Sequence, residues 1–296
     1  MNNNPAIATP ARTQAILNRY NLSAKKSLGQ NFLTDLNILT QITEAAELTS
    51  NDNVIEIGPG IGGLTEQLAQ RAGHVLAFEI DQNLIPVLAE TLAPYDNVTV
   101  LNQDILQANL PDTTKEIFGT DEGLKVVANL PYYITTPIVM DLIQNPVQFA
   151  NIVVMMQKEV AERLTATPRQ KAYGSLSVIV QQLTVPEIAF TVPNTAFIPS
   201  PKVDSAIVRL LPADPSKPQP YSQKRFIGFV RGCFMHRRKS IWNNLQGVFG
   251  KDATTKAVIK QGLEQLNIDA GVRPEELTVA QFVALTDKYH ELGLLK

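Results

Sequence analysis

Short apolar segments alternate with stretches of helical periodicity through the first two thirds of the chain. Val54, Ile55 and Ile57 form an apolar segment of strand length, and a helical pattern follows it at 64–71. Regular alternation of strands and helices is typical of a doubly wound, mostly parallel α/β sheet. The predicted strands are 53–57, 74–78, 98–101, one ending at Asn129, 152–156, 178–183, 185–191 and 206–211; the predicted helices are 14–20, 36–46, 64–71, 82–92, 137–143 and one beginning at Lys158.

The alternation stops at a stiff proline-rich linker, residues 213–220. Beyond the linker, helical periodicity predicts amphipathic helices at 221–234, 239–246, 254–262 and 279–292. The pattern therefore predicts an α/β domain at 1–212, in which residues 1–20 form a loose tail, and a smaller all-α domain at 221–296.

Composition narrows the class of protein. The 296 residues are 44% hydrophobic and 18% charged, which suits one large core plus a smaller domain. No apolar run reaches the roughly 18 residues of a membrane span, and the N-terminus lacks the pattern of a secretory signal. Cys233 is the single cysteine, which excludes an internal disulfide and fits a reducing cytoplasm. Three scattered histidines and one cysteine give no metal-ligand cluster, so we expect no metal.

A glycine-rich turn follows the first apolar strand. Gly58-Pro59-Gly60-Ile61-Gly62-Gly63 satisfies G-x-G-x-x-G, in which glycines let the backbone approach a ligand closely. Glu79 lies about twenty residues further on, at the end of the next strand, where a carboxylate holds ribose hydroxyls in either an NAD or an S-adenosylmethionine site. A glycine turn without a ligand stays an alternative. Glu56, two residues before the first glycine, completes an E-x-G-x-G-x-G pattern that resembles motif I of class I methyltransferases, and this resemblance favours S-adenosylmethionine.

Polar residues also end two further strands. Asp104 follows the strand at 98–101, where it either contacts the cofactor or only begins a helix. Asp81 is more typical of a helix N-cap than of a ligand. Asn129 ends another strand and begins Asn-Leu-Pro-Tyr, in which Pro131 keeps Leu130 extended. An ordinary Asn-Pro turn at a strand end is the alternative interpretation of this motif.

Asn-Leu-Pro-Tyr resembles motif IV of methyltransferases that act on the exocyclic nitrogens of bases. An adenine N6 lone pair is delocalised into the ring and is a poor nucleophile. The Asn129 side-chain carbonyl and the Leu130 backbone carbonyl can accept both N6 hydrogens and aim the lone pair at a methyl donor. Tyr132 can stack on the base once it has left its helix. Rate then comes mainly from positioning, with no strong general base.

Several motifs in order resemble one family. They are KKSLGQNFL at 25–33, E-x-G-x-G-x-G from Glu56, Asn-Leu-Pro-Tyr, F-x-P-x-P-x-V-x-S from Phe197, RRKSIWNNL and GVRPEELTVAQFVALTD. On these motifs the chain is identified as a member of the ribosomal RNA adenine N6-dimethyltransferases, of the bacterial small-subunit type. The resemblance implies a class I methyltransferase fold with a mostly parallel seven-stranded sheet. It also implies dimethylation of N6 on two adjacent adenosines near the 3′ end of 16S ribosomal RNA, in the assembling small subunit.

The resemblance also implies roles for individual residues. Asn31 and the Leu33 backbone contact the methionine end of the cofactor, and Asp104 contacts its adenine amino group. Phe197 provides a second stacking face for the target adenine, although its local sequence alone equally favours a core position. The full set of cofactor-binding candidates is Asn31, Leu33, Glu56, Gly58, Gly60, Glu79, Asp104 and Asn129, and that of catalytic candidates is Asn129, Leu130, Pro131, Tyr132 and Phe197.

Basic residues are concentrated in one part of the chain. The overall net charge is −2, yet residues 217–250 contain seven lysines and arginines and no acid. Such a cluster is typical of contact with a phosphate backbone, whereas a merely solvated helix face normally includes acids. The RNA-binding candidates are Lys25, Lys26, Lys202, Lys224, Arg225, Arg231, Arg237, Arg238 and Lys239.

Other functions remain possible from the sequence. A related class of enzyme methylates an adenine of large-subunit ribosomal RNA and confers antibiotic resistance. An NAD-dependent oxidoreductase would explain the glycine turn but not Asn-Leu-Pro-Tyr. A role as a checkpoint in subunit assembly is compatible with the enzyme. We expect a cytoplasmic monomer that uses S-adenosylmethionine and binds the small ribosomal subunit.

Overall fold

The computed structural model describes residues 5–22 and 28–296, and these fall into two units. The first unit is Met1–Ala161 with Glu187–Pro212, and the second is Glu162–Pro186 with Ala213–Lys296. Residues 162–186 thus cluster with the C-terminal part, although the sequence analysis placed them in the first domain. The reason is that the helix within this segment packs against two C-terminal helices, α9 (Gln223–Cys233) and α12 (Val279–Glu291).

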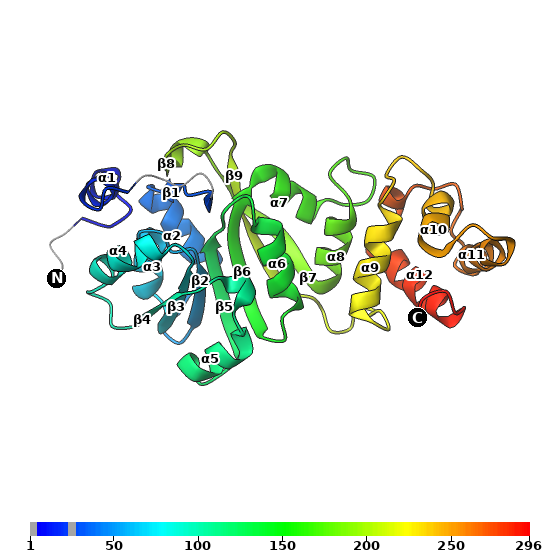
Figure 1. Ribbon diagram of the computed structural model, residues 1–296, viewed down its shortest axis with the longest axis horizontal. Helices are drawn as coiled ribbons and strands as arrows, with labels where there is room; N and C mark the ends of the chain where they lie inside the picture. The colour runs from blue at the N-terminus through cyan, green and yellow to red at the C-terminus, as the bar shows by residue number, and fades with distance from the viewer. Residues whose placement is uncertain (1–4, 23–27) are drawn as a thin grey trace. The chain divides into compact units, whose positions relative to one another are not determined.

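The first unit is built around a seven-stranded sheet in the order β4-β3-β2-β5-β6-β9-β7 (Figure 1). Five neighbouring strands, β4 to β6 in this order, pair in parallel, whereas β9 is antiparallel to β6. This mostly parallel sheet confirms the predicted fold class. The strands are β2 (Asn53–Ile57), β3 (His74–Glu79), β4 (Val98–Asn102), β5 (Glu122–Asn129), β6 (Gln148–Gln157), β7 (Thr184–Val192) and β9 (Ser205–Pro212).

The order of the strands reverses between β2 and β5. The chain leaves β2 toward β3 and β4, then returns to the other side of β2 to form β5 and β6. The connections after β2 and β5 therefore leave in opposite directions, which opens a crevice at the carboxyl ends of these two strands. Helices and short turns supply the connections: α2 (Leu36–Ala45), α3 (Gly63–Ala69), η2 (Gln82–Leu84), α4 (Ile85–Thr91), η3 (Ile105–Gln107), α5 (Leu110–Phe118), α6 (Thr135–Gln144), α7 (Lys158–Thr165) and η4 (Asn194–Ala196).

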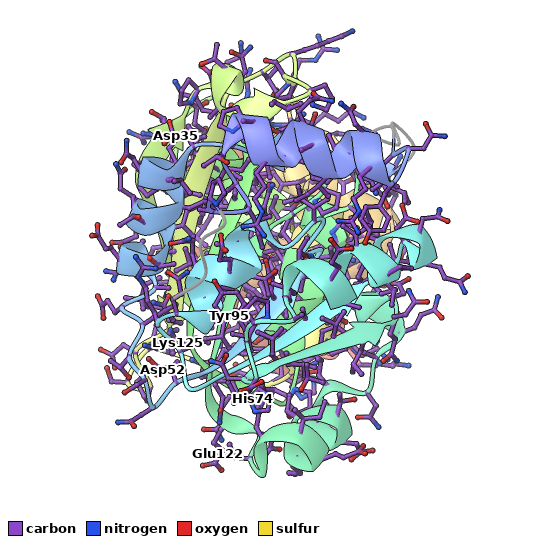
Figure 2. All side chains as sticks on the ribbon, turned by 90° about the vertical axis from the view of Figure 1, so that its left-hand side faces the viewer. Asp35, Asp52, His74, Tyr95, Glu122 and Lys125 are labelled. Atoms are coloured by element: carbon purple, nitrogen blue, oxygen red, sulfur yellow. The ribbon has the colours of Figure 1, made fainter. Side chains whose placement is uncertain are left out.

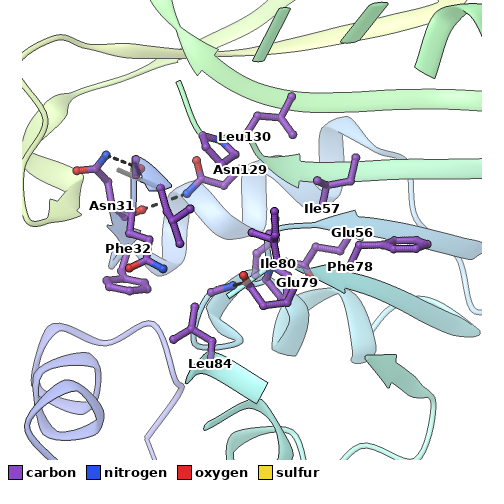
Figure 3. A pocket seen from close by; sticks show the side chains of 18 of the residues that line it. Asn31, Phe32, Glu56, Ile57, Phe78, Glu79, Ile80, Leu84, Asn129 and Leu130 are labelled. Atoms are coloured by element: carbon purple, nitrogen blue, oxygen red, sulfur yellow. Dashed lines mark hydrogen bonds between the residues drawn. The ribbon is translucent and has the colours of Figure 1, made fainter. Parts of the chain in front are cut away.

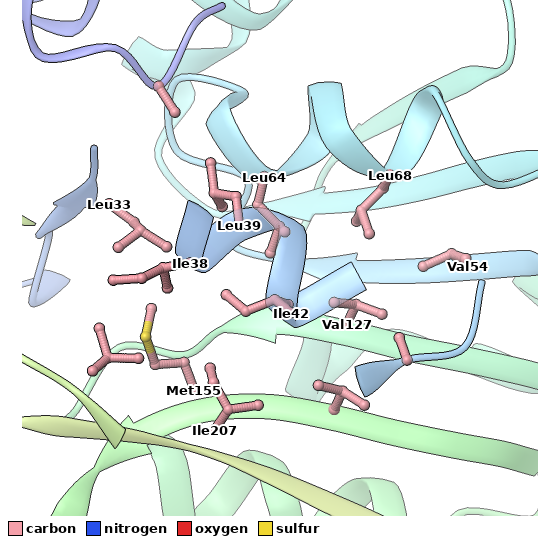
Figure 4. Packing of buried hydrophobic residues seen from close by; sticks show 14 of the residues in the cluster. Leu33, Ile38, Leu39, Ile42, Val54, Leu64, Leu68, Val127, Met155 and Ile207 are labelled. Carbon is pink, nitrogen blue, oxygen red and sulfur yellow. The ribbon is translucent and has the colours of Figure 1, made fainter. Parts of the chain in front are cut away.

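Helix α2 supplies much of the core on one face of the sheet. Asp35 caps the helix by accepting the backbone N–H groups of Asn37 and Ile38. Leu39 and Ile42 are at most 2% exposed and belong to one buried cluster with side chains of α3 and of the central strands (Figure 4). This packing holds α3, the helix that follows the glycine turn, against the sheet.

A partly buried ion pair connects β5 to the residue that precedes β2. Lys125 Nζ lies 3.0 Å from Asp52 Oδ2 and donates to the Glu47 carbonyl at 2.6 Å. Figure 2 shows Lys125 and Asp52 next to each other. Because Asp52 immediately precedes β2, the contact ties the amino end of β2 to the middle of β5.

The N-terminal segment is ordered on the first unit, so the prediction of a loose tail at 1–20 is wrong for the described residues. Helix α1 spans Pro10–Arg19, with its proline in the first turn. Ile7 is fully buried, and its backbone N–H donates to Glu66 Oε2 at 2.7 Å. The buried face of α1 consists of Thr13, Ile16 and Leu17, whose spacing matches the helical period.

Two further predictions of secondary structure need correction, and one helix was not predicted. Residues 178–183 are not a strand but part of helix α8 (Ser175–Leu183), whose first turn is closed by a bond from the Gly174 N–H to Ser177 Oγ. A short buried apolar run is compatible with either element, so periodicity alone does not decide. Pro86 lies in the first turn of α4, and the predicted helix at 82–92 is divided there into η2 and α4. Helix α5 had no counterpart in the prediction.

The second unit contains only helices apart from the start of β7. Its core includes Phe226, Phe229 and Tyr289, and the Tyr289 hydroxyl donates to the Ile259 carbonyl at 3.0 Å. The four helices predicted beyond the linker are confirmed with shifted ends. Within residues 5–22 and 28–296, no helix combines the length and apolar character needed to cross a lipid bilayer. The remaining elements are α10 (Ile241–Phe249), α11 (Ala253–Gln265) and η5 (Pro274–Glu276).

We expect Ile7→Ala to lower the free energy of unfolding by about 2–4 kcal/mol, because it removes a fully buried side chain. Urea unfolding measures this change. Leu36→Ala is the matched control, since Leu36 is 37% exposed and should change stability by less than about 0.5 kcal/mol. Equal stabilities of the two variants would show that residues 5–22 are not packed on the unit in solution.

Candidate active site

A pocket lies at the carboxyl ends of β2, β3, β4 and β5, in the crevice made by the reversal of strand order. Each of these strands contributes residues from its tip or from the loop that follows. Figure 3 shows Asn129 and Leu130 on one side of the pocket, with Glu56 and Glu79 across from them. Apolar side chains such as Phe32 complete the lining.

The glycine turn forms one wall of the pocket. Gly58 and Gly60 have φ angles of +70° and +63°, in the region that favours glycine. A Cβ added to Gly58 would meet no atom within 4 Å, whereas one on Gly60 would lie 3.3 Å from the Phe32 ring. The Gly58 N–H donates to the Phe78 carbonyl at 2.9 Å, which holds the turn against the end of β3.

Glu79 joins the tips of β2 and β3. One carboxylate oxygen accepts the Gly60 N–H at 3.2 Å, and the other accepts the Asp81 N–H at 2.7 Å. Burial raises the pKa of Glu79, and these two hydrogen bonds act in the opposite direction. A carboxylate oxygen accepts more than one hydrogen bond, so Glu79 retains capacity for a ligand's hydroxyl groups.

Glu56 is a buried acid on the floor of the pocket. Its side chain is 1% exposed, and Oε2 has no hydrogen-bond partner among the described residues. Burial raises the pKa of Glu56 to about 8; the nearby charge of Glu79 adds to this effect and the Thr65 hydroxyl opposes it. An unpaired buried carboxyl that lines a pocket is a group prepared to meet a polar or cationic ligand.

Asn129 lies at the tip of β5 and faces the loop that precedes α2. Its Nδ2 donates to the Asn31 carbonyl at 3.3 Å, while the Asn31 amide donates to the Gly29 carbonyl at 3.1 Å. This orientation leaves Asn129 Oδ1 without a hydrogen bond within the described part of the chain. The backbone N–H of the next residue, Leu130, donates to the Met155 carbonyl at 3.2 Å, which holds this loop against β6.

The two aromatic side chains that were predicted to stack on a base have different environments. Tyr132 is half-buried and lines the pocket, and its hydroxyl lies 2.6 Å from Ser205 Oγ. Burial raises the pKa of the Tyr132 hydroxyl. Phe197, by contrast, is 4% exposed, pairs with Leu33 in the small sheet of β1 (Phe32–Leu33) and β8 (Phe197–Ile198), and belongs to the buried cluster of Figure 4. It is a core residue that does not line the pocket, which corrects the prediction of a second stacking face.

Apart from Phe197, the structure brings the predicted cofactor and catalytic residues to one pocket. Asp104 lines it and also caps η3 through the Leu106 N–H, so its capping role is confirmed and its contact with a cofactor stays a prediction. Asp81 caps η2, as predicted. The residues that share the pocket are Asn31, Leu33, Glu56, Gly58, Gly60, Glu79, Asp104, Asn129, Leu130, Pro131 and Tyr132.

The sequence analysis missed several residues of the pocket. Ala8 and Thr13 reach it from the N-terminal segment, and a Cβ added to Gly63 would lie 3.2 Å from that of Ala8. The helical spacing of Thr13, Ile16, Leu17 and Tyr20 was the signal that this segment packs on the unit. Ile80, which directly follows Glu79, and Tyr133, which directly follows Tyr132, also line the pocket.

The basic candidates that the structure describes do not line the pocket. Lys25 and Lys26 lie outside the described residues, and Lys202 is exposed on the first unit. In the second unit, the Arg237 guanidinium donates to the Lys171 and Tyr173 carbonyls at 2.9 and 2.8 Å and lies 3.3 Å from Glu275 Oε2. Arg237 thereby ties together two loops of this unit. The other basic candidates of the unit are exposed, namely Lys224, Arg225, Arg231, Arg238 and Lys239.

Comparisons with known proteins agree on one family. The model of the family described as ribosomal RNA adenine dimethylase matches residues 21–290. The chain is 60% identical to ribosomal RNA small subunit methyltransferase A of Levilactobacillus brevis and 57% identical to that of Ligilactobacillus salivarius, over 98% of each chain.

Two solved structures are similar to this chain over most of its length. A dimethyladenosine transferase from Plasmodium falciparum is 27% identical with a TM-score of 0.74, and the match covers 88% of this chain and 98% of that one. The 23S rRNA methyltransferase ErmE is 29% identical with a TM-score of 0.66, and the match covers 87% and 99%.

We expect Glu56→Gln to flatten the pH dependence of stability. Between pH 4.5 and about 8 the folded protein keeps the Glu56 proton that the unfolded chain has lost, so this carboxyl makes the free energy of unfolding fall as pH rises. The slope is at most about 1.4 kcal/mol per pH unit. Urea unfolding at pH 5, 6.5 and 8 without cofactor measures it, with exposed Glu44→Gln as the control. Parallel profiles for wild type and Glu56→Gln would contradict the assignment.

Proposed function

The chain belongs to the ribosomal RNA adenine dimethylase family, and we propose that it dimethylates N6 of two adjacent adenosines near the 3′ end of 16S ribosomal RNA, with S-adenosylmethionine as methyl donor. The observation that carries this proposal is the position of Asn129. Its amide stands at the tip of β5, beside the glycine turn that ends β2, with Oδ1 free to accept a hydrogen bond. The names and identities of the relatives support the small subunit as substrate.

The residues of the pocket fit S-adenosylmethionine. The open space at Gly58 admits a ligand against the backbone, and Glu79 has acceptor capacity for ribose hydroxyls. The unpaired buried oxygen of Glu56 suits a cofactor that carries positive charge. Asp104, Asn31 and Leu33 complete the proposed binding set. When bound, S-adenosylmethionine supplies a methyl group made electrophilic by its sulfonium.

The protein's own groups would then orient the acceptor nitrogen. The Asn129 carbonyl and the Leu130 backbone carbonyl accept the two hydrogens of N6, which turns its lone pair toward the methyl donor. The bond from Asn129 Nδ2 to the Asn31 carbonyl selects this orientation of the amide, because it commits the nitrogen and leaves the oxygen free. The rate therefore depends chiefly on positioning rather than on a strong base.

Tyr132 provides the surface on which the target adenine stacks. Its hydroxyl is held by Ser205 at the start of β9, so the ring is oriented before RNA arrives. Pro131 restricts the loop between Asn129 and this ring. An adenine that has left its helix can then be held on its face by Tyr132 and on its edge by Asn129.

The exposed basic residues of the second unit are the proposed contacts with the phosphate backbone of the small subunit. Lys224, Arg225 and Arg231 lie along α9, and Arg238 and Lys239 follow it. Their charge is not neutralised by acids within residues 217–250. A cytoplasmic location follows from a substrate that is an assembling ribosomal subunit.

The large-subunit alternative keeps one supporting observation, the similarity to ErmE. It shares the proposed chemistry and differs only in the RNA. Primer extension on 16S and 23S ribosomal RNA after methyl transfer distinguishes the two, and stops confined to 23S RNA would overturn the small-subunit proposal. An NAD-dependent oxidoreductase gives no role to the Asn129 amide or to Tyr132, and calorimetric titration with each cofactor tests it.

We expect Asn129→Ala to lower methyl transfer to small subunits that lack the modification by about 100-fold or more, because N6 loses one of its two acceptors. Transfer from labelled S-adenosylmethionine measures the rate. Asn37→Ala, an exposed asparagine on the same unit, serves as the control and should retain full activity. Retained transfer by Asn129→Ala would refute the role assigned to this amide.

We expect neighbouring arginines to differ in effect. Arg238→Ala should weaken binding to small subunits and reduce the salt dependence of binding by about one unit of slope, with unchanged stability. Arg237→Ala should instead lower the free energy of unfolding by about 1–3 kcal/mol, because two backbone carbonyls lose their donor. Binding titrations at several salt concentrations and urea unfolding measure both. An unchanged salt slope for Arg238→Ala would contradict its contact with phosphate.

A further inference from the structure

Tyr133 is a pocket residue that the proposed reaction leaves without a role. It lines the pocket, yet 56% of its surface is exposed. No described residue forms a hydrogen bond with its hydroxyl. An aromatic side chain exposed beside a binding pocket offers a planar apolar face and a polar tip to a partner that enters the pocket.

The neighbouring aromatic residues cannot offer the same surface. Tyr132 is held inside the pocket by its bond to Ser205, and Phe197 is buried in the core. Ile80 is 52% exposed at the pocket but has no aromatic face. Among the described pocket residues, Tyr133 is therefore the exposed aromatic ring that is available to a planar group outside the pocket.

The backbone and one packing contact fix the place of this ring. The Pro131 carbonyl accepts the Ile134 N–H at 3.2 Å and the Thr135 hydroxyl at 2.9 Å, which closes the turn that carries Tyr133 into α6. A Cβ added to Gly29 would lie 3.3 Å from Tyr133 Cδ1, so the ring rests against a residue without a side chain. A ring held in this way loses little freedom when a base stacks on it.

We propose that Tyr133 is a stacking platform for the nucleotide next to the target adenosine. The inference rests on the proposed function, in which the two substrate adenosines are adjacent. While one adenine occupies the pocket against Tyr132, its covalently linked neighbour has to pass the mouth of the same pocket. Unpaired bases are commonly held by stacking on aromatic side chains, with little dependence on hydrogen bonds. Tyr133 thus positions the RNA strand and takes no part in the chemistry.

The test uses the full chain and small subunits that lack the modification. We compare Tyr133→Ala with Tyr133→Phe, which keeps the ring, and with Leu36→Ala, an exposed residue of the same unit outside the pocket. Steady-state transfer gives KM for subunits and kcat, mass spectrometry of the RNA fragment gives methylation at each adenosine, and calorimetry gives the Kd for S-adenosylmethionine.

We expect Tyr133→Ala to raise KM for subunits roughly 5- to 100-fold, the effect of losing one base stack, and to make methylation of the two adenosines unequal. Its Kd for S-adenosylmethionine should stay within about twofold of wild type. Tyr133→Phe and Leu36→Ala should behave like wild type. A structural role of Tyr133 would not change KM and the ratio of the two products while leaving cofactor binding intact.

Two outcomes overturn the inference. One is a Tyr133→Ala protein with wild-type KM and equal methylation at both adenosines. The other is a Tyr133→Ala protein whose main defect is weaker cofactor binding, which would make Tyr133 a wall of the cofactor site. Failure of the proposed function itself is distinguishable, because wild-type protein would then transfer no methyl groups to these adenosines.

Discussion

The structure depends on the parallel pairing of β2 with β5 at the centre of the sheet. The pairing begins at Val54 with Lys125, and β2 ends three residues later and β5 four residues later. The carboxyl ends of the two strands therefore lie side by side. Because their connections leave in opposite directions, the glycine turn and the Asn129 loop face each other across open space. The ion pair of Lys125 with Asp52 adds a side-chain contact between the two strands where their pairing begins.

The pocket also contains two buried carboxyls whose burial is unfavourable. Glu56 and Glu79 are both buried, burial raises the pKa of each, and the nearby charge of Glu79 raises that of Glu56 further. Their proximity costs stability, whereas Lys125 and Asp52 offset each other's charge. Local violations of good packing and charge pairing are expected where function requires them. A bound cationic cofactor would relieve this cost, so the same carboxyls that weaken the free protein would strengthen the complex.

The sequence predicted those parts of the structure that depend on local pattern. The glycine turn and Asn129 follow apolar strands directly, and parallel topology then brings the strand ends together, so eleven of the twelve cofactor and catalytic candidates share the pocket. Contacts between distant segments were not predictable. The bond from Ile7 to Glu66 spans 59 residues, and Arg237 binds carbonyls 64 and 66 residues away. Phe197 is a similar case, because its pairing with Leu33 determines which way its ring is buried.

The charge distribution suggests how the proposed substrate is selected. A net charge of −2 gives little general attraction to RNA, and Arg237 is committed to internal contacts. Five exposed basic residues of the second unit lie in α9 or just after it. They allow only a moderate number of phosphate contacts. Such a protein should bind naked RNA weakly, because phosphate contacts supply most of non-specific affinity. Discrimination then has to come from the shape of the proposed substrate and from the aromatic and amide groups that we propose to hold two unpaired bases at the pocket.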